Sequence, residues 1–195
     1  FEACDALTSI TIPSSVTTME YAICNASNLQ EFIVAPSNTC FKAVDGVLMN
    51  YDGTKIVNYP TGKVGAYTVP QEVTSIGHSA FQFAMGMDEL ILNEGIVEIE
   101  GYALWNCNGL KEIVFPASLA KVGPCWFDAC KNVESVTFKS DTPVSYPGSL
   151  RENCSIYVPN DAVETYKSVW SDYADRIYPI DVEGSVVGPG VENPD

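Results

Sequence analysis

Apolar residues recur along most of the chain with a fixed period. The stretch 110–132 shows the pattern most clearly. Its apolar positions are Leu110, Ile113, Phe115, Leu119 and Val122. The same spacing recurs 23 residues earlier, from Met87, and 23 residues later, from Val133. A fixed period of this size predicts a solenoid, in which each unit buries its apolar side against its neighbours.

The repeating unit predicts a short strand, a return segment and a turn. The units begin at Leu7, Leu29, Val64, Met87, Leu110 and Val133. Apolar residues at the first, fourth and sixth positions indicate a strand with one face inward, and a proline such as Pro70 then ends it. A second apolar pair follows, and then a small and a large residue such as Ala80-Phe81. This last segment is too short for an ordinary helix and predicts one helical or 3₁₀ turn.

The step from Leu29 to Val64 is longer than the others and indicates an insertion at about 38–62. Asp52-Gly53 separates the apolar-rich runs 47–51 and 55–59, which is a strong hairpin signal. We expect a β-hairpin that stands off one side of the solenoid.

The C-terminal part departs from the period and predicts a cap at about 155–180. Residues 155–159 resemble a last strand, and Asp161 and Glu164 have the spacing of a capping box. Val163, Tyr166 and Trp170 then fall on one face of a helix. We expect residues 1–180 to form one solenoid around one continuous core, and 181–195 to be an acidic Gly/Pro linker or tail.

Composition narrows the possible partners. The chain has 25 acidic and 10 basic residues, which give a net charge of −15. The electrostatic field of this negative charge repels nucleic acid and anionic lipid. No apolar run is long enough for a transmembrane helix, so we expect no membrane insertion of this segment. Phe1 and Cys4 precede Leu7 as Leu104 and Cys107 precede Leu110. The sequence therefore begins partway through a repeat, and we expect it to be a piece of a longer protein.

The repeat resembles a known family. LTSITIPSSV at 7–16 and the pattern from Tyr67 to Phe81 are similar to the BspA-like leucine-rich repeat, a 23-residue variety found in bacterial surface proteins. The insertion and the ending at 157–170 look similar to those of this family as well. The resemblance implies an α/β repeat solenoid of the leucine-rich-repeat type, with short parallel strands, helical or 3₁₀ turns, an inserted β-hairpin and a C-terminal helical cap. It also implies a secreted or cell-surface location, with adhesion to host or bacterial surfaces described for some members.

The chain offers few residues for catalysis. His78 is the single histidine and stands at a repeat turn. Cys4, Cys107 and Cys130 share a repeat column with alanines, which favours free thiols in small buried positions; a Cys107–Cys130 disulfide is the alternative. Neither zinc nor calcium ligand spacing is present. We expect no enzyme activity, no cofactor and no metal.

The exposed face of the stacked strands is the candidate binding surface. Its outward positions combine glutamates with β-branched residues. The candidate residues are Thr11, Glu31, Ile33, Thr68, Glu89, Ile91, Glu112, Val114 and Thr137. The alternative is a solvated sheet face with β-branched residues chosen for strand formation alone. The hairpin, with Tyr51 and Tyr59, is a second candidate because insertions often carry function.

These patterns favour a non-catalytic binding or adhesion module of a secreted or cell-surface bacterial protein. Its partner would be a surface protein or glycan from the host or from bacteria. The alternative function is a structural spacer that displays another domain away from the cell, with 181–195 as the link.

Overall fold

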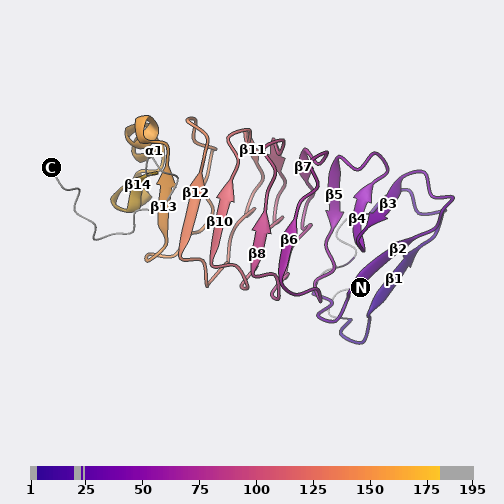
Figure 1. The fold of residues 1–195 in the computed structure, drawn as a ribbon. Helices are drawn as coiled ribbons and strands as arrows, with labels where there is room; N and C mark the ends of the chain where they lie inside the picture. Colours follow the sequence, from indigo (N-terminus) through magenta and orange to yellow (C-terminus); the bar gives the residue numbers. More distant parts are fainter. Residues whose placement is uncertain (1–3, 20–22, 24, 181–195) are drawn as a thin grey trace.

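The chain forms a β-solenoid whose coils stack along one axis (Figure 1). The computed structural model describes residues 4–19, 23 and 25–180. One long side of the stack carries the first strand of each coil and the last strands of the chain. These are β1 (Ser9–Ile12), β2 (Glu31–Val34), β6 (Ala66–Thr68), β8 (Glu89–Ile91), β10 (Glu112–Phe115), β12 (Ser135–Phe138), β13 (Ser155–Val158) and β14 (Ile177–Pro179). They pair in parallel, and the predicted leucine-rich-repeat-like solenoid is confirmed.

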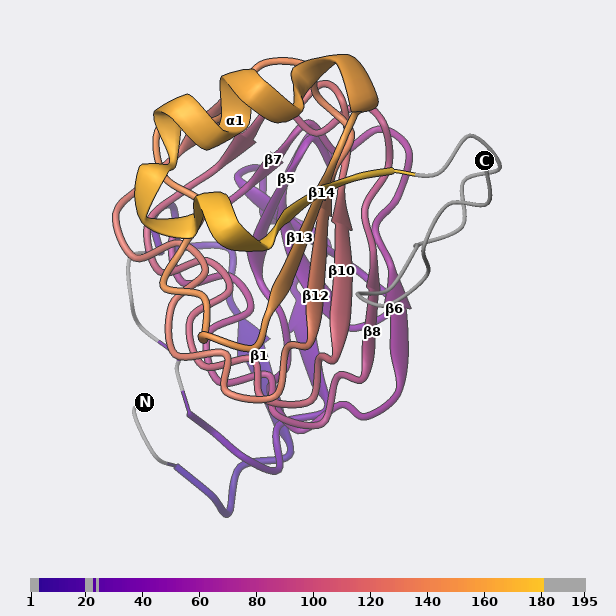
Figure 2. The same ribbon diagram turned by 90° about the vertical axis from the view of Figure 1, so that its left-hand side faces the viewer.

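A second sheet runs along the opposite side of the stack, and the sequence pattern did not reveal it. Its strands, in spatial order, are β11 (Lys121–Val122), β9 (Glu98–Ile99), β7 (Ser75–Ile76), β5 (Lys55–Asn58), β4 (Val47–Asn50) and β3 (Phe41–Val44). The return segments of the coils that begin at Val64, Met87 and Leu110 contribute only two residues each to this sheet. Alternation cannot show in so short a strand, so the sequence predicted only a return segment. Figure 2 looks along the stack with both sheets in view.

The insertion is part of this second sheet and does not stand off the solenoid. β3, β4 and β5 pair antiparallel, and β5 then pairs in parallel with β7. Val47, Leu48 and Met49 are each at most 1% exposed. A strand buried on both faces shows a continuous apolar run instead of alternation, and β4 has this pattern.

The interior consists of two hydrophobic cores, so the expected single continuous core is wrong. Val47 and Met49 belong to the larger core, which extends along the stack to Ile177. Leu48 belongs to the smaller core, which the first two coils and Phe41 build. The inserted strands therefore act as a partition between the N-terminal coils and the rest of the stack.

The turns that follow the second-sheet strands form a further ladder. Where we expected one helical or 3₁₀ turn, the backbone has positive φ at Ser79 (56°) and Phe83 (64°), and a helix cannot pass through such residues. Backbone N–H groups of Ser79, Phe81 and Phe83 donate to carbonyl oxygens of the next coil. The turns therefore tie neighbouring coils together.

The C-terminal cap consists of a 3₁₀ turn (Asn160–Ala162), α1 (Val163–Val169) and a 3₁₀ helix (Ser171–Arg176). The predicted capping box is wrong, because the helix starts after Ala162 and no side chain caps it. Tyr166 Oη donates to Ser140 O (2.8 Å), and Trp170 Nε1 donates to Val144 O (3.0 Å), so both buried rings close the end of the larger core. None of the helices in the described ranges is long and apolar enough to cross a bilayer. The expected tail at 181–195 lies outside the described residues.

Cys40, Cys107, Cys125, Cys130 and Cys154 are free thiols. Cys107 and Cys130 are buried, and their Sγ atoms donate to Phe81 O and Leu104 O, each at 3.1 Å. The prediction of free thiols in small buried positions is confirmed for these two residues.

Candidate functional site

The structure places the predicted surface residues on the outward side of the first-strand row, which we call the strand face. Adjacent strands bring them together in register, with Thr11 beside Ile33, Thr68 beside Ile91, and Val114 beside Thr137. All nine residues are exposed except Thr137, which is half-buried. Thr137 also lies in register with Tyr157 of β13, and this large neighbour explains its partial burial.

The strand face is interrupted in two places, and the insertion causes the first interruption. The Asp45-Gly46 turn between β3 and β4 lies beside β2, where Phe32 N donates to Gly46 O (2.8 Å). Thr11, Glu31 and Ile33 therefore lie on a separate two-stranded sheet from the other six candidates (Figure 1). The exposed face that the repeat predicts is therefore interrupted at this point.

A second division lies between β8 and β10. These strands are neighbours in the stack but belong to different sheets, so no ladder of backbone hydrogen bonds joins them. A groove of about 270 Å³ opens along the division. Its lining residues are Glu89, Leu90, Ile91, Leu92, Glu94, Glu112, Ile113, Val114, Pro116 and Lys139. Four of the nine predicted face residues thus meet in one groove.

The groove carries negative charge that the described residues do not fully neutralise. At one end Lys139 Nζ lies 2.7 Å from Glu94 Oε1, and Ala117 N donates to Glu94 Oε2 (3.2 Å). The hydrogen bond from Lys139 is the main cause that lowers the pKa of Glu94. Within the described ranges no ion pair involves Glu89 or Glu112. Ile91 (44% exposed) and Val114 (43%) add apolar surface beside these carboxylates.

The hairpin candidates have opposite environments. Tyr51 is 56% exposed, whereas Tyr59 is 1% exposed and packs 5.1 Å, between ring centroids, from both Tyr67 and Phe81. Burial is the main cause that raises the pKa of Tyr59 to about 12. Tyr59 is wrong as a surface binding residue, because this end of the insertion turns into the larger core.

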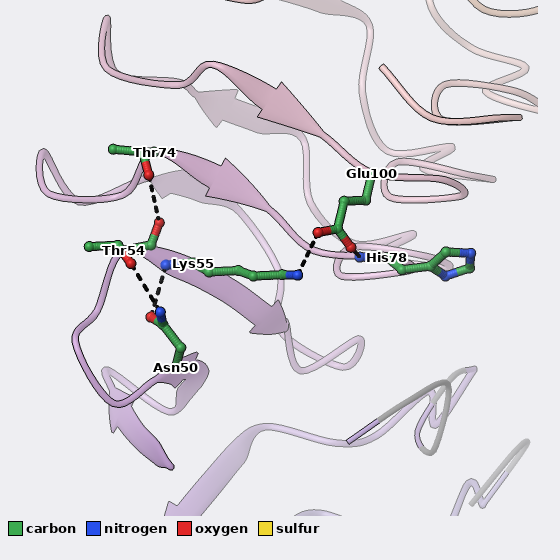
Figure 3. Close-up of polar contacts among 6 residues, drawn as sticks. All are labelled: Asn50, Thr54, Lys55, Thr74, His78 and Glu100. Atoms are coloured by element: carbon green, nitrogen blue, oxygen red, sulfur yellow. Dashed lines mark hydrogen bonds and ion pairs between the residues drawn. The ribbon is translucent and has the colours of Figure 1, made fainter. Parts of the chain in front are cut away.

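A cavity of about 430 Å³ lies on the second sheet, and sequence reasoning missed it. Its polar lining includes Lys55 and Glu100, whose Nζ and Oε1 atoms are 2.5 Å apart (Figure 3). These residues are 45 positions apart; Lys55 belongs to β5, and Glu100 directly follows β9. The repeat register places them two coils apart, but only the pairing of β5 with β7 reveals that they can meet.

The single histidine and the buried thiol of Cys154 belong to different parts of the stack, since His78 follows β7 and Cys154 precedes β13. The His78 ring points away from Lys55 and Glu100, and its Nδ1 lies 2.9 Å from Ser79 Oγ (Figure 3). Burial raises the pKa of the Cys154 thiol to about 11, so it is a protonated core thiol at neutral pH. Across the described ranges, no group of three or more His, Cys, Asp or Glu side chains could hold a metal ion.

Comparisons with known proteins agree with this architecture. The family model described as "BspA type Leucine rich repeat region" matches six copies, over residues 1–45 and 57–160. No curated protein matches the chain. A leucine-rich repeat protein from Eubacterium ventriosum has 25% sequence identity and a TM-score of 0.70, over 79% of this chain and 42% of that one.

Two further solved structures are similar. The pneumococcal vaccine antigen PcpA has 19% identity and a TM-score of 0.58, over 89% of this chain and 54% of that one. A leucine rich cell surface protein from Faecalibacterium prausnitzii has 19% identity and a TM-score of 0.46, over 73% of this chain and 41% of that one. The chain thus spans about half, or less, of the length of each of these proteins.

Proposed function

Because the chain belongs to the BspA type leucine-rich repeat family, we propose that it is a non-catalytic binding module of a secreted or cell-surface bacterial protein. Its strand face binds an extended, basic segment of a partner protein, and the groove between β8 and β10 is the centre of that contact. The observation that supports this most strongly is the pair Glu89 and Glu112, which line one groove without an ion-pair partner among the described residues.

Electrostatics favours a cationic partner. Glu89 and Glu112 occupy equivalent positions of neighbouring coils, and like charges that line one groove repel each other. A lysine or arginine side chain placed between the two carboxylates removes this repulsion. The net charge of −15 also attracts a cationic partner from a distance and speeds its association at low ionic strength.

The size of the groove favours a peptide segment over a small molecule. At about 270 Å³ it lies below the range of roughly 300–1,000 Å³ that is usual for small-molecule pockets. It has room for one or two side chains of a segment that continues along the face. In an extended peptide, alternate side chains point to the same side, so the lysines of a Lys-Val repeat all face the groove. Their ammonium groups can contact the carboxylates while their aliphatic chains pack on Ile91 or Val114.

The experiment that tests this uses an alternating Lys-Val peptide as the probe, with an alternating Glu-Val peptide as the charge control. Isothermal titration calorimetry against the 195-residue chain measures both affinities. We expect binding of the Lys-Val peptide only. Binding should weaken as salt is raised, because exposed charges are screened.

A matched pair of variants separates the groove from the overall charge. Glu89→Lys/Glu112→Lys should abolish binding, whereas Glu72→Lys/Glu152→Lys makes the same change in net charge at exposed sites outside the groove and should retain it. Glu31→Lys tests whether the separate β1–β2 sheet contributes. Equal loss in both double variants would show that binding follows net charge alone and would refute the groove.

The spacer function has one observation in its favour. The coils stack in a single row, so the described N-terminal coil and the cap lie at opposite ends of the stack (Figure 1). Such a row can hold a neighbouring domain at a distance without binding anything itself. Absence of binding to the Lys-Val peptide and to immobilised host-matrix and bacterial cell-surface preparations would favour the spacer.

A further inference from the structure

The cavity on the second sheet is a consequence of the insertion. Its lining includes Phe41, Asn50 and Val57 of the inserted strands together with Thr18 and Met19 of the first coil. The inserted strands widen the second sheet, whereas residues 16–19 of the first coil form no strand that pairs with it. The cavity therefore lies at the boundary where the N-terminal coils meet the partition.

The charged groups of the cavity neutralise one another. Lys55 Nζ contacts Glu100 Oε1 at 2.5 Å, and the backbone N of His78 donates to Glu100 Oε2 at 2.9 Å (Figure 3). Gly77 lies between Lys55 and Glu100 on this sheet. Because glycine has no side chain, there is space for the Lys55 side chain to pass over it and reach Glu100. Burial is the main cause that lowers the pKa of His78, which favours the uncharged ring. The lining as a whole has no net charge.

Polar groups with hydrogen-bonding capacity remain in this lining. The Lys55 ammonium has three donors, and one of them is directed to Glu100. Asn58, which is 8% exposed, donates through Nδ2 to Ile23 O (3.0 Å), but its buried Oδ1 has no hydrogen-bond partner among the described residues. A buried polar atom without a partner is rare and costs stability. This orphan acceptor marks the Asn58 end of the cavity as incompletely satisfied.

Apolar groups line the cavity beside these polar groups. Met19 and Val57 are half-buried, and Phe41 is 7% exposed. The cavity therefore combines an apolar wall with a few convergent hydrogen-bonding groups. At about 430 Å³ its volume falls in the range of roughly 300–1,000 Å³ that is typical of small-molecule sites.

We propose that this cavity is a second binding site, which takes a neutral polyhydroxylated ligand such as the terminal sugar of a glycan. Hydroxyl groups can both donate and accept hydrogen bonds, and thus suit a lining that offers the Lys55 ammonium, the Glu100 carboxylate and the Thr18 hydroxyl. The carbon–hydrogen face of a sugar ring packs against Met19, Phe41 and Val57. A charged ligand would have to compete with the Lys55–Glu100 ion pair and gains nothing from a lining without net charge. The site lies on the second sheet and does not depend on the strand-face proposal.

Saturation-transfer NMR on the 195-residue chain tests the site. The probes are the methyl glycosides of glucose, galactose and N-acetylglucosamine, with glucuronate and glucosamine as charged controls. We expect transfer to at least one neutral glycoside and none to the charged sugars. Absence of transfer to all neutral glycosides, or transfer to the charged sugars alone, would overturn the proposal.

Two variants locate the binding. Thr18→Trp fills the cavity from an exposed position, and Thr17→Trp places the same ring on a neighbouring exposed residue outside the lining. We expect at least about tenfold weaker glycoside binding in Thr18→Trp and no change in Thr17→Trp. Equal binding in the two variants would place the ligand elsewhere. Far-ultraviolet circular dichroism and thermal melting confirm that both variants are folded.

A charge-neutral double variant tests the stated chemistry. Lys55→Gln/Glu100→Gln keeps hydrogen-bonding groups in the cavity and removes both charges. We expect it to retain glycoside binding within about tenfold of the wild type. Complete loss, with the fold retained, would show that the ion pair itself is the recognition element and would contradict the assignment of a neutral ligand.

Discussion

Leu48 and Met49 are adjacent on β4, yet their side chains belong to different hydrophobic cores. Both are almost fully buried, at 0% and 1% exposure. The strand thus separates the two N-terminal coils from the remaining stack, and the two cores can be perturbed one at a time.

This arrangement predicts different effects from two similar truncations. Leu48→Ala should cost about 2–5 kcal/mol and loosen the N-terminal coils, because it opens a cavity in the smaller core. Met49→Ala should have a similar cost but act on the larger core. Hydrogen exchange followed by mass spectrometry measures this, with faster exchange expected across residues 25–37 in Leu48→Ala only. Identical exchange patterns in the two variants would contradict a partitioned interior.

The ion pair between Lys55 and Glu100 predicts a modest, salt-dependent coupling energy. Their side chains are 35% and 31% exposed, so solvent screens the interaction substantially. A double-mutant cycle with Lys55→Met and Glu100→Gln should give a coupling of roughly 0.5–1 kcal/mol, close to the upper end for exposed pairs. Denaturant titrations at low and high salt provide the measurement. A coupling that does not change with salt would show that the contact is not electrostatic in origin.

Gly123 predicts a much larger effect, because neighbouring coils approach closely there. A Cβ atom at this position would overlap the backbone nitrogen of Gly101, and backbone cannot move aside as a flexible side chain can. Gly123→Ala should therefore lower the free energy of unfolding by more than about 2 kcal/mol, within the range seen for strongly destabilising substitutions. Lys121→Ala, an exposed change on the same segment, is the control and should alter stability by less than about 0.5 kcal/mol. Similar stabilities of the two variants in denaturant titrations would refute the close approach.

Buried tyrosines predict a loss of stability at alkaline pH. Burial raises the pKa of Tyr59 to about 12 and also raises the pKa values of Tyr67 and Tyr166. Tyrosine side chains in the unfolded chain ionise near pH 10. Above that pH the unfolded chain therefore binds fewer protons than the folded chain, and folding becomes less favourable. The contribution of Tyr59 is thus fully present below about pH 10 and is lost as pH rises to about 12.

Removal of the Tyr59 hydroxyl group tests whether this residue causes the loss of stability. Tyr59→Phe should reduce the slope of unfolding free energy against pH above pH 10, whereas Tyr51→Phe at an exposed position should leave it unchanged. Denaturant titrations between pH 8 and about pH 11.5 measure the slope. Parallel curves for the wild type and Tyr59→Phe would remove Tyr59 from the explanation.

Much of the fold follows from the sequence because the repeat is redundant. The apolar positions of each unit specify the same strand. A departure from the repeat, such as Asn93 where the neighbouring units have Pro70 and Pro116, changes one coil only. Asn93 Nδ2 in fact donates to Pro70 O (2.6 Å) and Val73 O (3.1 Å), so it ties two coils together. The free thiols at Cys107 and Cys130 were predictable for the same reason, since alanine shares their column.

The rest depends on contacts that local patterns do not encode. The Asp52-Gly53 turn correctly indicates that β4 and β5 pair antiparallel. The residues of the turn do not reveal what packs on the outer face of these two strands. The continuous apolar run at Val47, Leu48 and Met49 was the available signal for burial on both faces. The groove between β8 and β10 arises where a ladder is missing, and the cavity arises from two segments far apart in sequence. Neither has a sequence signature.

Peptide-induced hydrogen-exchange protection is the most direct test of the strand face as a binding surface. The alternating Lys-Val peptide is added in excess to the wild type and to Glu89→Lys/Glu112→Lys. Slower exchange is predicted in the segments that contain residues 89–94 and 112–116 of the wild type, with no change in the variant. Protection that maps elsewhere, or that persists unchanged in the variant, would contradict the groove between β8 and β10 as the binding site.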